Sequence, residues 1–177
     1  MEHKDYLVDL IDEAGQVVGQ KLRHQIRKKH DRYHSVHVMI LTPQHEIVLS
    51  QIPERQDLPN VYARRLGTTV ATIRRSGETA AQAAQRALQH DLFLREAALH
   101  RLGEAMFDLA DGYRSLTTAF WVVAEPPERF STIDIESLKV MPMPLFVAAL
   151  RSNPDYFSAT LREIWTRWGA KLGNQHG

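Results

Sequence analysis

The chain has 177 residues, 44% of them hydrophobic and 24% charged, which is typical of one globular domain. Its net charge of +1 gives no general affinity for nucleic acid or for a membrane surface. There is no cysteine, so disulfides and thiolate metal sites or nucleophiles are excluded. No apolar run approaches the roughly 20 residues that span a bilayer, and the charged N-terminal segment does not resemble a signal peptide. We therefore expect a soluble cytoplasmic protein.

Strand patterns dominate the first part of the chain. Residues 6–12 are a short apolar segment that ends at the turn DEAG. Residues 34–42 and 46–52 are rich in apolar and β-branched residues, and the polar turn PQH between them predicts a hairpin. Residues 65–74 are predicted to be extended because they are rich in β-branched residues.

A helix is predicted over residues 77–93, with Thr79 as a candidate N-cap, because this segment has many alanines and no proline. Residues 97–110 and 116–125 follow as a second predicted pair of strands.

Apolar residues at three-to-four-residue spacing then predict two C-terminal helices, at 143–154 and 156–172. No repeat or long linker divides the chain. We predict a single domain, 1–177, in which the C-terminal helices 143–172 pack on a mixed β-sheet as part of an α/β arrangement.

The segment TIRRSGETAAQAAQRALQHDLFL, residues 72–94, has Glu78 and Arg86 separated by seven residues and aliphatic residues at Leu88 and Leu94. This spacing resembles the Nudix signature GX5EX7REUXEEXGU, where U is aliphatic. The flanking segments 8–53 and 151–165 resemble isopentenyl-diphosphate-isomerase-like Nudix proteins. The likeness spans about residues 5–168 and implies a Nudix-type α/β/α sandwich with a mixed sheet.

The signature is degenerate at five positions. Its two glycines fall on Thr72 and Phe93, the glutamate after the arginine falls on Ala87, and the paired glutamates fall on His90 and Asp91. In active members the carboxylates at these last three positions hold divalent ions, and such positions share one helix face. Alanine offers no ligand, and imidazole suits transition metals better than magnesium. The resemblance therefore implies at most weakly bound Mg²⁺ or Mn²⁺.

Two hypotheses for function remain open. In the first, the protein is weakly active or inactive and binds a phosphorylated metabolite or a partner protein. In the second, it is a divergent metal-dependent hydrolase of a nucleoside-diphosphate-linked or related diphosphate substrate. The cation of this hydrolase would be held by Glu78, Asp91 and a loop carboxylate. The candidate loop carboxylates are Glu104, Asp108 and Asp111.

The resemblance also assigns further roles. It makes Glu78 and Arg86 a scaffold pair that braces the loop against the helix. It places the segment around residues 66–73 at the border of the substrate cleft. Isomerase activity is not expected, because the family's cysteine motif falls on Ala71, Thr72 and Ile73.

Basic residues are candidates for phosphate binding, because guanidinium groups bind phosphate oxygens in pairs. The candidates are Arg64, Arg65, Arg74 and Arg75, which flank the predicted strand. The basic run 21–34, with Lys28 and Lys29, is interpreted either as a solvated face or as a phosphate cradle. A histidine metal site is disfavoured, because His34 and His37 are predicted to point to opposite faces of a strand. No pattern indicates an oligomeric state.

Overall fold

The computed structural model describes residues 5–54, 64–110 and 112–173, and these form a layered α/β structure. Nine strands join in one sheet. They are β1 Leu7–Ile11, β2 Val17–Leu22, β3 Tyr33–Leu41, β4 Glu46–Gln51, β5 Leu66–Gly67, β6 Val70–Ile73, β7 His100–Asp108, β8 Arg114–Val123 and β9 Ser137–Pro142.

Strand β3 is the centre of the sheet, because it pairs with four other strands. It is antiparallel to β1, β4 and β6, and it is parallel to β8 along its whole length. The remaining strands extend the sheet by antiparallel pairing: β2 on β1, β7 on β8, and both β5 and β9 on β4. The sheet is therefore mixed, as predicted.

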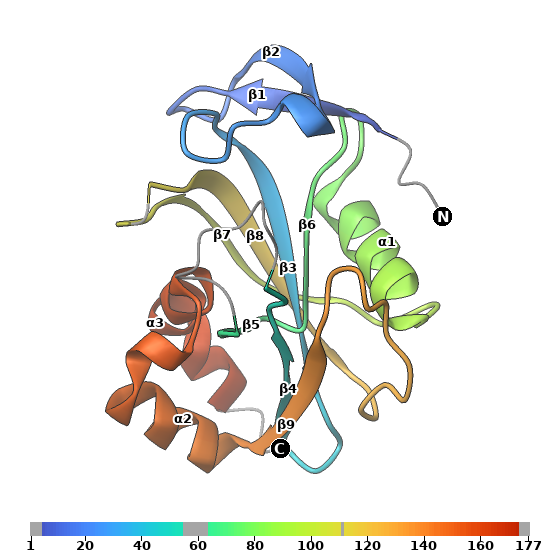
Figure 1. Ribbon diagram of the computed structural model, residues 1–177, viewed down its shortest axis with the longest axis vertical. Coiled ribbons are helices and arrows are strands. Elements are labelled where there is room, and N and C mark those ends of the chain that lie inside the picture. The colour runs from blue at the N-terminus through green and yellow to red at the C-terminus, as the bar shows by residue number, and fades with distance from the viewer. Residues whose placement is uncertain (1–4, 55–63, 111, 174–177) are drawn as a thin grey trace.

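Helices cover both faces of the sheet. Helix α1 (Ala80–Leu92) lies on one side, and α2 (Met143–Ser152) and α3 (Ala159–Gly173) lie on the other (Figure 1). Within the described ranges, short 3-10 helices occupy Arg23–Gln25 and Pro154–Tyr156. The predicted α/β/α sandwich is confirmed. No helix in the described part of the chain is long and apolar enough to cross a membrane.

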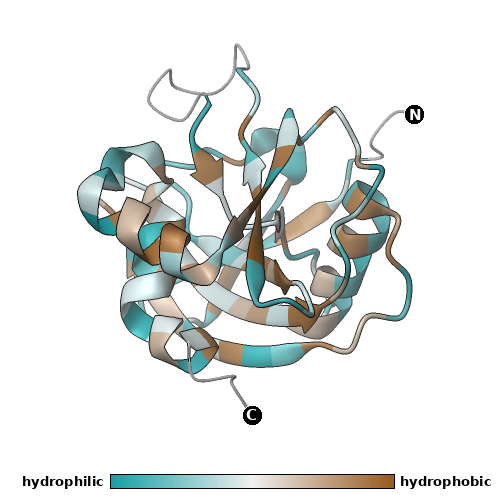
Figure 2. Ribbon diagram, turned by 90° about the horizontal axis from the view of Figure 1, so that it is seen from below, coloured by the Kyte–Doolittle hydropathy of each residue, from teal (hydrophilic) through white to brown (hydrophobic). Residues whose placement is uncertain are grey.

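The side chains of β3 alternate between two apolar cores, one on each face of the sheet. Val36, Val38 and Ile40 belong to the apolar cluster under α1, whereas Met39 and Leu41 belong to the cluster under α3. Successive side chains of a strand point to opposite faces, so one buried strand supplies both clusters. Figure 2 shows hydrophobic stretches along the central strands, whereas the helices carry hydrophobic and hydrophilic residues in alternation.

The hairpin of β3 and β4 and the strand pair of β7 and β8 are confirmed. The extended segment predicted at 65–74 is interrupted between β5 and β6. There the hydroxyl of Thr69 accepts a hydrogen bond from the backbone N–H of Ile40 and donates to the carbonyl of Val48. Hydrogen bonds of a side chain thus replace backbone hydrogen bonds of the sheet at this point. Strands β2 and β9 were not among the predicted elements.

Candidate functional site

The N-terminus of α1 is fixed by two sets of contacts. The hydroxyl of Thr79 accepts a hydrogen bond from the backbone N–H of Gln82, and the Gln82 side chain accepts one from the N–H of Thr79. This capping box satisfies helix N–H groups that have no partner within the helix. The residue before the cap, Glu78, is tied to Arg86 of the same helix, about two turns further on. The predicted N-cap is therefore confirmed.

Glu78 and Arg86 form a half-buried ion pair. The Nε of Arg86 donates to one carboxylate oxygen at 2.7 Å, and its Nη2 donates to the other at 3.0 Å. Arg86 also donates to the hydroxyl of Thr72 and to the carbonyl of Ile73. The guanidinium therefore connects α1 to the end of β6. We refer to the Glu78–Arg86 pair as the brace.

Both oxygens of Glu78 are occupied, because the backbone N–H of Arg75 also donates to one of them at 2.9 Å. Burial acts to raise the pKa of Glu78, but the hydrogen bonds from Arg86 and from the Arg75 backbone outweigh it and hold the pKa below its ordinary value. These contacts give the Glu78 carboxylate a structural role. That Glu78 also binds a metal stays a prediction.

The three ligand positions of the signature lie in different surroundings. Ala87 is only 3% exposed and belongs to the apolar cluster between α1 and the sheet, together with Ala83, Ala84 and Leu88. A carboxylate there would lie against methyl groups rather than in solvent. The residues present therefore do not form the cage of helix carboxylates that the resemblance implies for magnesium.

One group of potential metal ligands is formed by His90, Asp91 and Asp134. Within the described residues, these three can place one ligand atom each within 4.8 Å of the others. The Nδ1 of His90 lies 2.7 Å from an oxygen of Asp91, whose side chain is buried. The backbone N–H of Ser131 donates to the carbonyl of Asp91, which holds the loop that carries Asp134 against the helix end. We call this group the helix-end cluster.

The composition of the helix-end cluster determines which ions it fits. Magnesium favours six oxygen ligands in octahedral geometry, whereas an imidazole with two carboxylates suits manganese, zinc or iron.

Asp134 was not among the loop carboxylates predicted from the sequence. Of those, Glu104 accepts a hydrogen bond from the Thr118 hydroxyl, and Asp108 is exposed at the end of β7. Neither belongs to the cluster, and Asp111 lies outside the described residues.

The four candidate phosphate-binding arginines lie in two places. Arg64 and Arg65 lie just before β5. The backbone N–H of Arg64 donates to the carbonyl of Ile52, and the N–H of Ile52 donates to the carbonyl of Arg65. The guanidinium of Arg64 is 3.9 Å from the carboxylate of Glu54. Arg74 and Arg75 follow β6; the backbone N–H of Arg74 donates to the carbonyl of His34, and the guanidinium of Arg75 lies over the ring of Tyr6. The second pair thus adjoins the brace.

Histidines on β3 face opposite sides of the sheet, as predicted. His37 lies on the side of α3 and bonds to the Thr68 hydroxyl at 2.8 Å, and burial lowers its pKa to about 4. Burial and the nearby Arg74 guanidinium also lower the pKa of His34. Both rings are therefore neutral at pH 7. Neither belongs to a metal-ligating group in the described part of the chain.

A shallow cavity of about 430 Å³ adjoins the helix-end cluster, between residues 92–94 and 124–129. Phe93, one of its walls, is 51% exposed and has a left-handed backbone with φ 56°. The guanidinium of Arg129 lies 4.9 Å from the centre of its ring. The Nudix signature has a glycine at this position. The left-handed backbone accounts for that glycine, because glycine adopts positive φ without strain.

Comparison with solved structures agrees with this architecture. No protein-family model matches the chain, and no curated protein sequence does. The crystal structure of DR0079 from Deinococcus radiodurans is similar over 92% of this chain and 98% of its own, with 20% identity and a TM-score of 0.75. A MutT protein from Methanosarcina mazei covers 79% of this chain and 94% of its own, with 13% identity and a TM-score of 0.62.

A third similar structure contains a ligand. The NUDIX domain of Shewanella oneidensis NrtR, complexed with ADP ribose, covers 84% of this chain and 95% of its own, with 14% identity and a TM-score of 0.59. This chain shares its α/β/α fold with these three structures. The chain therefore has the Nudix fold, and the resemblance seen in its sequence is confirmed at the level of the fold.

Proposed function

We propose that this Nudix-fold protein binds a phosphorylated small molecule and hydrolyses diphosphates weakly or not at all. One observation supports the proposal most directly: Ala87 is buried among apolar side chains at a position where the active signature has a metal-binding carboxylate. Diphosphate hydrolysis depends on cations that neutralise developing charge and activate water. The fold does not need that carboxylate cage, because the brace and the two apolar cores are formed by other contacts.

Arginines support the binding half of the proposal. Where cations do not neutralise a diphosphate, guanidinium groups take over more of that role. Arg74 and Arg75 adjoin the brace, and the similar Shewanella protein is complexed with ADP ribose. We expect metal-independent binding that weakens with salt, because the contacts are charge pairs near the surface.

Calorimetry tests this proposal. The protein in EDTA is titrated with ADP-ribose, nucleoside diphosphates and an isoprenoid diphosphate at two salt concentrations, and hydrolysis is measured with Mg²⁺ and Mn²⁺. Binding with slow or absent turnover is the expected result. Turnover with magnesium at rates usual for enzymes would overturn it. Absence of binding to every diphosphate would leave a protein partner as the better hypothesis.

A second candidate function is metal-dependent hydrolysis, and the helix-end cluster favours it. His90, Asp91 and Asp134 would hold a transition-metal cation, which would supply charge neutralisation beside a diphosphate. The burial of Asp91 restricts solvent on one side of such a centre. The protein itself contributes the brace, which fixes the helix, and the loop contact at Ser131, which fixes Asp134.

An Asp134→Asn variant separates the two candidates. It keeps the shape of the side chain and lowers its affinity for a cation. If the helix-end cluster is a metal centre, Mn²⁺ or Zn²⁺ raises the unfolding midpoint of the parent protein and loses that effect in the variant. If the metal-independent proposal holds, ligand affinity in EDTA is the same in both proteins. Equal metal effects in parent and variant would remove the second candidate.

A further inference from the structure

Helix α2 is apolar, and only part of its apolar surface is covered by the core. Eight of the ten residues in its sequence, MPLFVAALRS, are apolar; Phe146 is buried, and four more, Met143, Val147, Ala149 and Leu150, are partly buried against the core. Leu145 is 62% exposed. A surface helix usually turns an apolar stripe to the core and a polar face to water. The apolar surface that α2 still exposes is therefore a candidate contact for another molecule.

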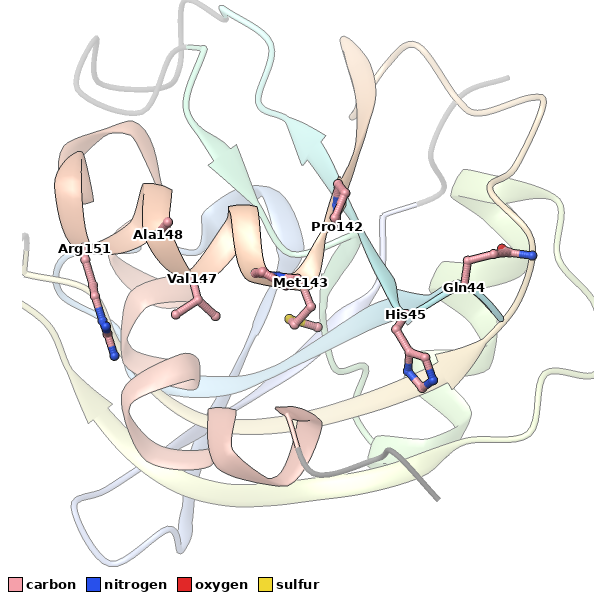
Figure 3. Close-up of a pocket in the computed structure, with 8 residues that line it drawn as sticks. Gln44, His45, Pro142, Met143, Val147, Ala148 and Arg151 are labelled. Atoms are coloured by element: carbon pink, nitrogen blue, oxygen red, sulfur yellow. The ribbon is translucent and has the colours of Figure 1, made fainter.

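A cavity of about 590 Å³ runs along this helix, which lies on the other side of the sheet from α1 (Figure 1). Its walls come from α2, the end of β9 and the turn between β3 and β4. In Figure 3 the side chains of Met143, Val147 and Arg151 point to the same side as His45. The helix residues are spaced by four, so they form one stripe on α2. We call this cavity the α2 groove.

The α2 groove combines an apolar floor with one permanent cation. Met143 and Val147 supply the floor, and Arg151 lies at its far end. Among the described residues, no carboxylate forms an ion pair with Arg151, and none lines the groove. The backbone N–H of Met143 donates to the carbonyl of His45, so the turn and the helix start form one rigid wall. The groove is therefore complementary to a molecule with an apolar body and one negative end.

We propose that the α2 groove binds an aliphatic monocarboxylate, with its chain on Met143 and Val147 and its carboxylate on the Arg151 guanidinium. Met143 and Arg151 are eight residues apart, which corresponds to about 12 Å along a helix. This length fits a medium-chain fatty acid, and the groove volume falls within the range of small-molecule sites. Guanidinium and carboxylate match in shape, and each pairs with the other through two hydrogen bonds.

A second copy of the chain is a poorer occupant. Two α2 helices that packed against each other would place an Arg151 against a groove without a carboxylate. The lining would then leave a cation partly desolvated and unpaired, which costs free energy. The charge pattern thus favours a small acid over self-association. This inference concerns a different face from the diphosphate site and does not depend on it.

Calorimetry with four probes tests the proposal: octanoate, decanoate, decanol and succinate. Decanoate is expected to bind with a Kd of about 0.1 mM or tighter, and octanoate more weakly, because each methylene adds apolar contact. Decanol lacks the charge, succinate lacks the apolar body, and both should bind at least tenfold more weakly than decanoate.

Exposed charges allow variants that do not disturb the core. Arg151→Glu should abolish decanoate binding, and Arg151→Lys should retain part of it, because lysine keeps the charge but not the paired geometry. Arg114→Ala, which changes an exposed arginine of β8, is the matched control and should bind as the parent does. Unchanged affinity in Arg151→Glu would overturn the proposal. So would a dimer, seen by sedimentation, that a Leu145→Asp variant dissociates.

Discussion

The brace should contribute more stability than any exposed ion pair, and Glu78→Gln tests this. The side chains of Glu78 and Arg86 are only 14% and 23% exposed. Glutamine keeps one acceptor but leaves the guanidinium without its opposite charge. Removal of one partner from a fully buried pair costs about 3–5 kcal/mol. Because the brace is only half-buried and one hydrogen bond survives, we expect about 2 kcal/mol, which lowers the midpoint of a domain of this size by about 6 °C.

Urea and thermal unfolding measure the loss. The matched control is Glu163→Gln, which removes an exposed i,i+4 pair with Arg167 at 2.8 Å on α3. That pair should contribute about 0.5 kcal/mol or less. Combining Glu78→Gln with Arg86→Met should restore part of the stability, since no charge is then left unpaired. If Glu78→Gln costs no more than Glu163→Gln, the reasoning about the brace is wrong.

Four further outcomes follow from the site. The folded-state pKa of Glu78 lies below its ordinary value of 4.5, so its contribution is complete above that pH and is lost as pH falls through the folded value. Acid titrations should therefore show the parent and Glu78→Gln converging in stability below pH 4.5. Ala87→Glu should destabilise the protein in EDTA by several kcal/mol, because its carboxylate is desolvated, and Mn²⁺ should recover stability only if the carboxylate reaches a cation. Phe93→Gly should be more stable than Phe93→Ala by about 1 kcal/mol in urea unfolding, since both lose the ring and only alanine is strained at positive φ. Charge reversal of Arg74 and Arg75 together should abolish metal-independent diphosphate binding in calorimetry, and unchanged affinity would exclude this pair as the phosphate site.

The fold was predictable where local signals and burial agree. The alanine-rich helix and the apolar strand β3 each carry both kinds of signal, and each lies where it was predicted, with the exposed Thr79 as a purely local signal for the start of the helix. Strand β2 has no buried residue, so apolar alternation is absent and only pairing with β1 makes it a strand. Strand β9 contains a lysine and ends in proline, and it is extended because β4 offers a free edge.

The candidate site was predictable only along α1. The resemblance to the Nudix signature anticipated the pairing of Glu78 with Arg86, which the structure shows between the residue before the N-cap of α1 and the helix itself. Asp134 was not predictable, since it lies far along the chain in a loop without periodicity, and the Ser131 contact and the packing of Ile135 against α1 bring it to Asp91. The burial of Ala87 depends on tertiary packing, although its place in an alanine-rich series gave a partial signal.

The parallel pairing of β3 with β8 has a consequence for biogenesis. Ser35 and Ser115, which hydrogen bond across this pair, are 80 residues apart. During synthesis, β3 has one long edge without a partner until β8 emerges, and its Met39, Ile40 and Leu41 are strongly apolar. Contacts of such long range form slowly, and open apolar edges recruit other chains. Expression of chains that end before β8 should therefore yield aggregates, and the full chain should depend on chaperones most during this interval.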